Sequence, residues 1–205
     1  MIKDIYVFDD IITKEEQILL YDFVNQKDLD WTHEKNITGY YGGNQKKFYP
    51  ANVLPKIKLK NENIIQIINK IEKSVIKKID LNFVENYRFK INWTRPLDFE
   101  YNPIDLLHVD NPVQHIAMVY YINDSTGDTY IYNDDEGNNA ENYQKHKHNS
   151  IDHTKFSLIK KVTPKMGRVV VFNGSLHHHA EYPKDGDRFI INFNFVAKEK
   201  NKSLI

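Results

Sequence analysis

The spacing of hydrophobic and polar positions changes along the chain, from a helical period near the start to strand-like alternation later. Residues 5–8 form a short apolar run of the strand type. Thr13 is followed three residues later by Glu16, which is the signature of a capping box at a helix start. We therefore expect a helix from there to about residue 25. Its apolar side would consist of Leu19, Leu20, Phe23 and Val24.

The longest helical pattern covers residues 61–80. Isoleucine or valine recurs there at the spacing that places side chains on one face of a helix. The positions concerned are Ile64, Ile68, Ile71, Val75 and Ile79. Lysines occupy the opposite face, and we interpret them as solvent-exposed rather than as a nucleic-acid-binding patch. A helix of this kind would cover one face of a sheet.

From residue 83 onward the hydrophobic period becomes two, which is the period of a β-strand. Tyr87, Phe89, Ile91 and Trp93 alternate with polar residues. Further strand-like segments occur at 103–109, 115–122, 128–133, 156–162, 168–173, 177–182 and 188–197. Because the helices come first and the strands follow, an all-β core is favoured over parallel βαβ winding.

We therefore predict a mainly β fold with flanking α-helices. Its core would be a double-stranded β-helix, that is, a cupin-like jelly roll, with the N-terminal helices packed on one sheet. The 205 residues fit a single domain spanning 1–205. Within that domain we expect a helical N-terminal support region at 1–82 and the jelly-roll catalytic core at 83–197.

Composition limits the partners more than it changes the fold. Lys and Arg together number 28, as do Asp and Glu, so no net charge draws the chain onto nucleic acid or an anionic membrane. Cysteine is absent, which excludes disulfides and thiolate metal sites. The N-terminal region has no apolar run as long as a signal peptide or a membrane span. We therefore expect a cytoplasmic protein, and the pattern does not indicate an oligomeric state.

Candidate chemistry begins at His108 and Asp110, which follow two leucines at 106–107. Residues two apart in an extended segment project to the same side, so the imidazole and the carboxylate would lie next to each other. Two histidines and one carboxylate make up the metal site of non-haem Fe(II) oxygenases. The second histidine would come from the run 177–179. Arg188 opens the next strand and can bind a carboxylate bidentately.

Two other segments carry residues of functional types, and we interpret both as loops. Residues 37–44 are rich in glycine and tyrosine and could close over a substrate, although a surface loop is the simpler interpretation. Residues 133–154 are strongly polar and include His146, His148 and His153. Nothing in their pattern orders these histidines around one ion, so we do not expect a second metal site there.

The order of the candidate residues resembles that of the Fe(II)- and 2-oxoglutarate-dependent dioxygenase superfamily, in its prolyl-4-hydroxylase-like branch. The resemblance covers roughly residues 83–197. Four segments carry it: His108-Val109-Asp110-Asn111-Pro112, Val119-Tyr120-Tyr121-Ile122-Asn123, Gly167-Arg168-Val169-Val170-Val171-Phe172, and His179-Ala180-Glu181-Tyr182-Pro183 followed by Arg188. One departure is Gly127-Asp128-Thr129, where relatives often carry Gly-Gly-Glu, and it leaves the substrate open.

The resemblance implies that Fe(II) is bound by His108, Asp110 and His179. We favour His179 because its offsets to the following proline and arginine match the family pattern without a gap. His178 remains an alternative whose offsets the family also tolerates, and His177 is a further one. His177 and His179 share a strand face, whereas His178 points the opposite way.

The resemblance also implies the binding of 2-oxoglutarate as co-substrate, with O2 as oxidant and ascorbate as a candidate stimulant. Arg188 would pair with the distal carboxylate of 2-oxoglutarate, Tyr121 would add a hydroxyl donor, and Asn192 would line the pocket. Core packing is the alternative role for Tyr121. Three residues border either the substrate channel or the core: Trp93, Arg95 and Tyr101.

The function implied is hydroxylation of an unactivated C–H, with release of succinate and CO2. The family-based substrate is a prolyl residue of a peptide or protein. A free amino acid, another small molecule or a nucleobase is the alternative. Two alternatives belong to other classes of protein: a non-catalytic cupin-like metal or ligand binder, and a jelly roll that serves as a structural module.

Overall fold

The computed structural model describes residues 2–35, 50–101, 106–111, 114–135 and 153–199. The glycine- and tyrosine-rich segment 37–44 therefore lies outside the described residues. The same holds for Pro112, His146 and His148. None of the helices in the described part of the chain is long and apolar enough to cross a membrane.

The larger of two sheets has seven strands, and every neighbouring pair is antiparallel. Its order across the sheet is β1 (Tyr6–Phe8), β8 (Val169–Asn173), β5 (Ile116–Tyr121), β10 (Arg188–Glu199), β4 (Leu81–Thr94), β3 (Ala51–Pro55) and β2 (Thr32–Glu34). β10 and β4 are the longest strands and pair along most of their length. They form the middle of the sheet, and one of their faces carries much of the site described below.

The smaller sheet has three antiparallel strands and faces the larger one. Its order is β7 (Phe156–Val162), β6 (Thr129–Asp134) and β9 (His177–Ala180). Apolar side chains from both sheets fill the space between them: Ala117, Val119, Tyr121, Ile131, Val162, Val170, Phe172 and Ile190. Two facing antiparallel sheets with few helices confirm the predicted jelly-roll class.

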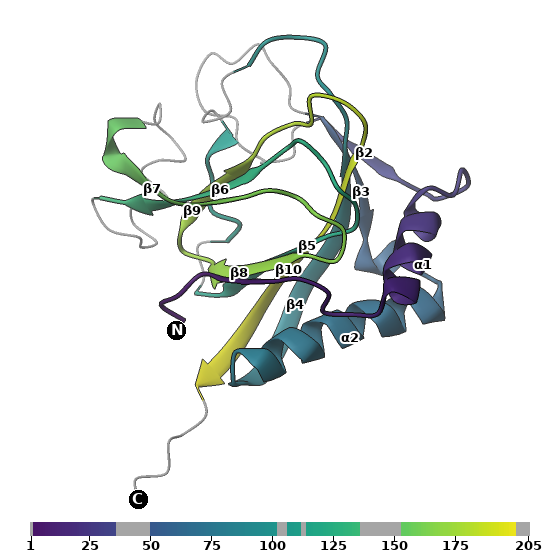
Figure 1. The fold of residues 1–205 in the computed structure, drawn as a ribbon, viewed down its shortest axis with the longest axis horizontal. Helices are drawn as coiled ribbons and strands as arrows, with labels where there is room; N and C mark the ends of the chain where they lie inside the picture. Colours follow the sequence, from purple (N-terminus) through teal and green to yellow (C-terminus); the bar gives the residue numbers. More distant parts are fainter. Residues whose placement is uncertain (1, 36–49, 102–105, 112–113, 136–152, 200–205) are drawn as a thin grey trace, which may run out of the picture.

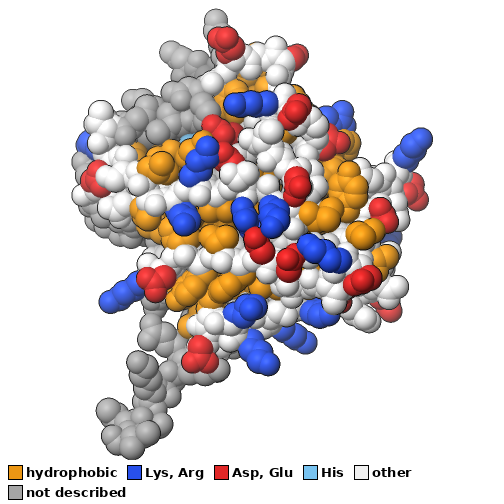
Figure 2. Space-filling model, viewed as in Figure 1, with side chains coloured by type: hydrophobic (Ala, Val, Ile, Leu, Met, Phe, Trp, Pro, Cys, Tyr) orange, Lys and Arg blue, Asp and Glu red, His pale blue; other side chains and the backbone are white. Residues whose placement is uncertain are grey.

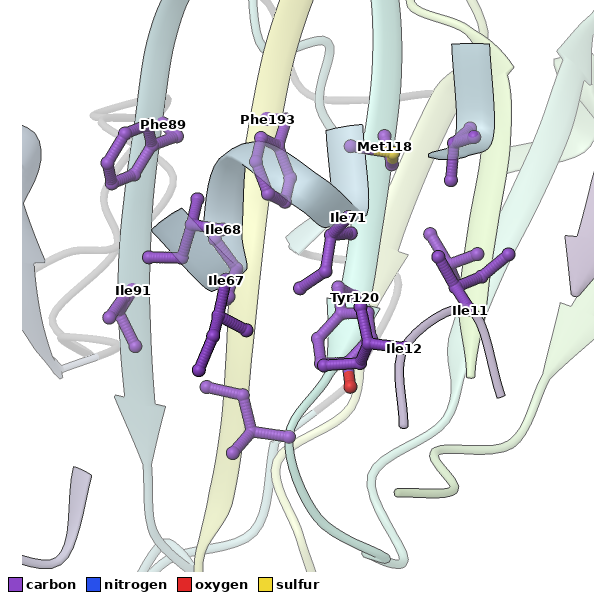
Figure 3. Close-up of a cluster of buried hydrophobic side chains, with 14 of the residues drawn as sticks. Ile11, Ile12, Ile67, Ile68, Ile71, Phe89, Ile91, Met118, Tyr120 and Phe193 are labelled. Atoms are coloured by element: carbon purple, nitrogen blue, oxygen red, sulfur yellow. The ribbon is translucent and has the colours of Figure 1, made fainter. Parts of the chain in front are cut away.

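Two helices cover the outer face of the large sheet, on the side away from the small sheet (Figure 1). They are α1 (Lys14–Val24) and α2 (Glu62–Lys78). All five apolar positions expected in the second helix are buried, and Ile71 and Val75 are fully so. Figure 3 shows Ile67, Ile68 and Ile71 of α2 packed over side chains of the sheet. The prediction that helices brace one sheet is thus confirmed.

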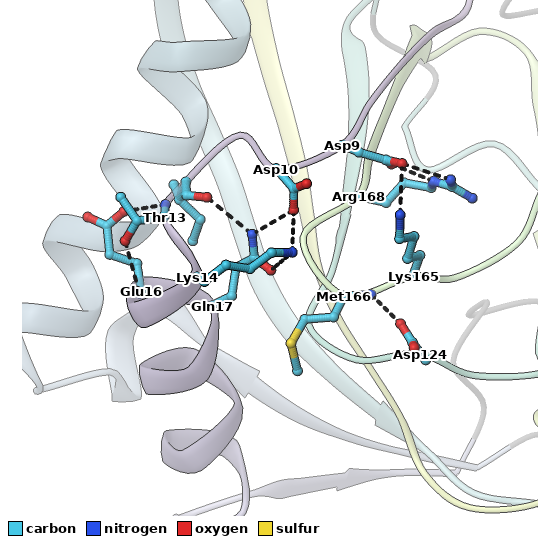
Figure 4. A network of polar contacts seen from close by, with 11 residues as sticks. Asp9, Asp10, Thr13, Lys14, Glu16, Gln17, Asp124, Lys165, Met166 and Arg168 are labelled. Atoms are coloured by element: carbon cyan, nitrogen blue, oxygen red, sulfur yellow. Dashed lines mark hydrogen bonds and ion pairs between the residues drawn. The ribbon is translucent and has the colours of Figure 1, made fainter.

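The start of α1 is fixed by polar contacts that also tie it to the sheet (Figure 4). The predicted capping box is present, with the Thr13 hydroxyl accepting from the Glu16 amide and the Glu16 carboxylate accepting from the Thr13 amide. Gln17 donates to the backbone of Ile12 from a buried position. Nearby, Asp9 pairs with Arg168 at 2.7 Å, which joins the segment before α1 to the residue preceding β8.

Some local predictions were wrong. Residues 106–111 form no regular strand, because His108 makes only an isolated bridge and residues 102–105 lie outside the described part. In α1 the Leu19 side chain is 53% exposed, whereas Gln17 is buried instead. Within the first 82 residues the predicted strand at 5–8 is present as β1, whereas β2 and β3, which were not predicted, also join the large sheet. Strand pairing with β4 and β8 therefore decides their structure more than local helical pattern does.

The surface seen in Figure 2 carries lysine and arginine side chains interspersed with aspartate and glutamate. Orange apolar patches lie between the charges on this face, without a stripe of one sign. This agrees with the balanced composition of the sequence, in which basic and acidic residues are equal in number.

Candidate functional site

The site is built where the segment holding His108 meets β9. The His108 amide donates to the His178 carbonyl at 3.0 Å, and the His178 amide donates to the His108 carbonyl at 2.9 Å. Residues directly opposite in an antiparallel pair project to the same side. The two imidazole rings consequently face each other, with their centroids 4.6 Å apart.

The two histidines present the same ring nitrogen to a common point. Nδ1 of His108 donates to the Leu106 carbonyl at 2.7 Å, and Nδ1 of His178 donates to the Leu176 carbonyl at 3.0 Å, since a carbonyl can only accept. In the neutral form of each ring, Nε2 then carries the lone pair that can bind a metal ion. Burial lowers the pKa of His178 to about 4, so this imidazole is neutral near pH 7, as a metal ligand must be.

Asp110 completes the cluster. Its two carboxylate oxygens lie 3.7 Å from Nε2 of His108 and 3.9 Å from Nε2 of His178. The ligand atoms of the three residues all lie within 4.8 Å of one another. Burial would raise the pKa of Asp110, but its polar neighbours, among them the Arg88 cation, outweigh that effect and hold the pKa well below its usual range. The group is an ionised carboxylate beside two imidazoles, which is the donor set of a facial metal site.

A ring of polar side chains from the large sheet holds the Asp110 carboxylate in place. Arg88 contacts one carboxylate oxygen at 3.1 Å. Asn194 and Asn192 donate to the other oxygen at 2.9 Å and 3.3 Å. Arg88 also donates to the Asn194 amide oxygen, so the holding groups are themselves fixed. The sequence analysis missed Arg88 and Asn194, although both fall on the alternating polar positions of their strands.

The structure corrects the predicted position of the second histidine. His178, and not His179, faces His108 and Asp110. His179 points the other way along β9 and stacks on the rings of Tyr130 and Tyr132, at centroid distances of 4.9 Å and 5.6 Å. The reason is the strand period of two, because a shift of one residue moves a side chain to the opposite face. The numbers of residues between the histidines and Pro183 or Arg188 are compatible with either His178 or His179, so they did not distinguish the two.

His177 is excluded from the cluster by the same alternation. It packs edge-on against Phe156 of β7, 4.8 Å between ring centroids. His177 and His179 thus share one face of β9, as expected from the sequence, and that face belongs to the small sheet's aromatic packing.

A second part of the site lies around Arg188, at the start of β10. Its side chain is buried, with the residue only 3% exposed. Nε donates to the Gly127 carbonyl at 2.9 Å and Nη2 donates to the Thr129 hydroxyl at 3.1 Å. Among the described residues, no carboxylate lies within ion-pair distance of its guanidinium. Burial lowers the pKa of Arg188, as expected for a buried cation that lacks an anion.

Thr129 lies between Tyr121 and Arg188 and contacts both. The Tyr121 hydroxyl donates to the Thr129 hydroxyl at 2.8 Å, while Arg188 donates to the same oxygen. A hydroxyl that accepts two hydrogen bonds retains its own proton as a donor. Thr129 lines the cavity, whereas Tyr121 stands behind it in the core between the sheets. Thr129 could have been found from the alternation of β6, which places residues 129 and 131 on the inner face.

Gly127 allows β6 to approach Arg188 this closely. A Cβ atom at this position would lie 2.4 Å from the Glu181 carbonyl oxygen and 3.0 Å from the Arg188 side chain. Asp128, next in the chain, pairs with Lys161 at 2.7 Å, and its attraction offsets only part of the effect of burial on the pKa of Arg188. The Gly127-Asp128-Thr129 segment thus supplies a carbonyl and a hydroxyl to the guanidinium.

One cavity joins the histidine–aspartate cluster to Arg188. It opens between the two sheets and is lined by Lys90, Asn92, Thr94, Leu106, His108, Asp110, Val119, Thr129, His178, His179, Ala180, Glu181, Tyr182, Arg188, Ile190 and Asn192. The predicted pocket residue Asn192 lies between the two ends and leaves its amide oxygen buried without a partner. A molecule with a carboxylate at one end and metal-binding oxygens at the other would match this arrangement.

Of the residues considered for the substrate channel, Trp93 belongs to the core. It packs on Trp31 and Phe189, at centroid distances of 5.5 Å and 5.6 Å, beneath the guanidinium of Arg95. Tyr101 stands closer to the cavity, since its hydroxyl accepts from the amide of Tyr182 at 2.7 Å.

Comparison with known proteins gives a relationship at the level of fold. No protein-family model and no curated protein sequence matches the chain. Among solved structures, the fold is similar to that of a prolyl hydroxylase from Trichoplax adhaerens in complex with a peptide fragment of the hypoxia-inducible factor oxygen degradation domain. The TM-score is 0.57 at 11% identity, over 93% of this chain and 83% of that one.

Two further structures are similar to the same degree. An oxidoreductase of the 2OG-Fe(II) oxygenase family from Burkholderia pseudomallei gives a TM-score of 0.59 at 12% identity, over 93% of this chain and 84% of that one. HygX from Streptomyces hygroscopicus, with nickel and 2-oxoglutarate bound, gives 0.56 at 12% identity, over 96% and 83%. The fold of this chain is therefore the jelly roll of 2-oxoglutarate–Fe(II) oxygenases.

Proposed function

We propose that the protein is an Fe(II)- and 2-oxoglutarate-dependent dioxygenase. The observation that carries the proposal is the presence of a potential metal-ligand set and a buried guanidinium in one cavity. At one end, His108, Asp110 and His178 bring two imidazole nitrogens and a carboxylate close enough to bind one metal ion. At the other end, the Arg188 guanidinium is buried, and no carboxylate of the described residues lies within ion-pair distance of it. Burying a charge without its partner is costly, so both ends fit a bound metal and a bound carboxylate.

The donor set suits Fe(II) and the pocket suits 2-oxoglutarate. Two imidazoles and one carboxylate leave three positions on an octahedral ion for other ligands. When bound, iron and 2-oxoglutarate supply the oxidation of an unactivated C–H by O2, with release of succinate and CO2. Arg188 would hold the distal carboxylate of 2-oxoglutarate, with the Thr129 hydroxyl as a second donor. Tyr121 would act through Thr129, and Asn192 would line the space between the two ends.

The remaining task of the chain is to orient the ligands and to exclude water. The backbone carbonyls of Leu106 and Leu176 fix the two imidazole tautomers. Arg88, Asn192 and Asn194 fix the carboxylate of Asp110. The apolar side chains of Val119 and Ile190 form the wall of the cavity along β5 and β10 and keep it dry.

The finer proposal is that the hydroxylated group is a prolyl residue of a peptide or protein. The likeness in fold to a prolyl hydroxylase that binds a peptide supports it, as do the His108 segment and the order of the site residues. A free amino acid, another small molecule or a nucleobase is the second candidate, since the Gly127-Asp128-Thr129 segment departs from the family pattern. A cytoplasmic location stays a prediction that cell fractionation would check.

Anaerobic titration of the purified protein with Fe(II) and 2-oxoglutarate tests the proposal without knowledge of the substrate. We expect the visible charge-transfer band of the iron–2-oxoglutarate chelate, and its loss in the Asp110→Ala protein. Iron binding without the band would favour the non-catalytic cupin-like binder. Failure to bind iron at all would favour the structural module.

A further inference from the structure

The face of the large sheet that lines the cavity extends beyond it to the edge of the sheet formed by β3 and β2. In the register of β4 and β10, Lys90 lies opposite Asn192, and Asn192 donates to the carboxylate of Asp110. Lys90 therefore belongs to the metal-site end of the cavity and not to the Arg188 end. It lines the cavity on the side away from β5, together with Asn92 of the same strand.

The side chain of Lys90 is largely shielded from solvent, and its charge has one distant ion-pair partner. The Lys90 side chain is only 15% exposed. Among the described residues its sole ion-pair partner is Glu34 of β2, at the long distance of 3.9 Å, and the Glu34 side chain is itself 38% exposed. Burial lowers the pKa of Lys90, and the attraction of Glu34 and of Asp110 works against that effect. Such a cation would gain stability from an anion brought into the cavity.

Neutral hydrogen-bonding groups surround this cation. The amide oxygens of Asn92 and Asn192 are buried without partners. Arg88, the other nearby cation, is committed to Asp110 and Asn194. The unengaged groups at this end of the cavity are thus one ammonium, which donates, and two amide oxygens, which only accept. A carboxylate can pair with the ammonium, and N–H donors of the same molecule can satisfy the amide oxygens, whereas the second charge of a phosphate would meet Glu34 rather than another cation.

We propose that Lys90 binds a carboxylate of the primary substrate, beside the metal-binding residues and separate from the Arg188 site for 2-oxoglutarate. The inference rests on the proposed function, because it assigns the substrate of that same site. It names Lys90 as a specificity-determining residue and carboxylate-bearing molecules as the substrate class. The carboxylate could belong to a free amino or imino acid, or to an acidic or C-terminal residue of a peptide.

Matched acids and amides distinguish these sources. The iron-loaded protein would be supplied with 2-oxoglutarate and O2, and succinate formation would be measured with added L-proline, N-acetyl-L-proline, an unblocked peptide ending in proline, and a blocked peptide containing Glu-Pro. Each acid would be compared with its carboxamide, the last with Gln-Pro. We expect an acid to stimulate succinate formation, with its amide needing a concentration about tenfold higher or more. The pair that responds identifies the source.

Variants then attribute the preference to Lys90. Lys90→Met should remove the difference between acid and amide while leaving the 2-oxoglutarate requirement unchanged, and Lys90→Arg should retain the preference. Glu34→Gln should lower the half-saturating concentration of the acid, because it removes the carboxylate that competes for Lys90. If the Lys90–Glu34 pair had only a structural role, Lys90→Met and Glu34→Gln would instead change the half-saturating concentration of the acid in the same direction. Lys58→Met, which changes a lysine paired with Asp30 on the turn after β3, should change neither quantity.

Three results would overturn the inference: an amide that works as well as its acid, a Lys90→Met protein that keeps the acid preference, or no response to any acid. Failure of the proposed function is distinguishable from these. If the proposed function is wrong, the wild-type protein lacks the iron–2-oxoglutarate band before any substrate is added. If only the inference about Lys90 is wrong, the band forms normally.

Discussion

His108 and His178 are joined by two reciprocal backbone hydrogen bonds, of 3.0 Å and 2.9 Å. The bridge is isolated, because the segment around His108 does not form a regular strand. This pairing fixes which of the three consecutive histidines faces Asp110. It also sets the direction of both rings, because each Nδ1 donates to the carbonyl two residues earlier in its own segment. The candidate metal site is thus defined by backbone geometry before any metal is bound.

The first prediction separates His178 from His179. His178→Ala should abolish stoichiometric iron binding, because it removes one of three ligands. His179→Ala should retain iron, since that ring stacks on Tyr130 and Tyr132 and does not face the cluster. Iron content after anaerobic loading and desalting measures the difference. The opposite result would restore His179 as the ligand.

The second prediction concerns Arg88, which contacts Asp110 at 3.1 Å. Loss of a group that orients a metal ligand typically weakens metal affinity by about 10–100-fold. We therefore expect Arg88→Met to weaken Fe(II) binding by roughly that factor. The apparent dissociation constant from a competition titration with a chelator would measure it. Lys70→Met provides a control, because Lys70 pairs with Glu16 on the helical side of the sheet. Equal affinity in Arg88→Met and wild-type proteins would show that Asn194 and Asn192 suffice.

The third prediction concerns Arg188. A charge-assisted hydrogen bond contributes about 1.5–3 kcal/mol, which corresponds to roughly a tenfold or greater change in binding. Arg188→Ala should therefore raise the 2-oxoglutarate concentration needed for half-maximal formation of the charge-transfer band by at least about tenfold. Iron binding measured without 2-oxoglutarate should be unchanged. An unaltered 2-oxoglutarate requirement would mean that another basic residue holds the carboxylate.

The fourth prediction tests the hydroxyl of Thr129. Thr129→Val keeps the shape of the side chain but removes the donor that faces the cavity and the acceptor for Tyr121 and Arg188. It should raise the 2-oxoglutarate requirement severalfold, and Thr129→Ser, which retains the hydroxyl, should restore most of the affinity. Tyr121→Phe should have a smaller effect than Thr129→Val, because Tyr121 reaches the pocket only through Thr129. A larger effect of Tyr121→Phe would show that the tyrosine binds the co-substrate directly.

The fifth prediction concerns the pH dependence of stability in the metal-free protein. Burial lowers the pKa of His179 to about 3, whereas a histidine of an unfolded chain titrates near pH 6.5. Between these values the unfolded state binds more protons, so the free energy of unfolding rises with pH. His179 should contribute fully above about pH 6.5 and lose its contribution as the pH falls toward 3. Urea unfolding at pH 7.5 and pH 5 would measure the loss, and His179→Phe, which keeps the stacking, should reduce it.

The sequence by itself determined the fold class and brought part of the candidate site together. Alternation of period two after residue 83 and the helical spacing of 61–80 were enough for a jelly roll braced by helices, because both patterns record which side of an element is buried. The spacing of His108 and Asp110 brought an imidazole and a carboxylate together, and Arg188 was placed at the start of a strand.

Only the tertiary structure decided which residues meet inside the cavity. His178 replaced His179 because the register between the His108 segment and β9 is set by long-range backbone pairing, which local spacing does not encode. Thr129 stands in front of Tyr121 because β6 and β5 belong to different sheets whose separation is set by packing. Lys90 is largely shielded from solvent because β2 and β3 extend the sheet beyond β4. Each of these facts depends on contacts between segments distant in sequence, which is why the local pattern could not supply them.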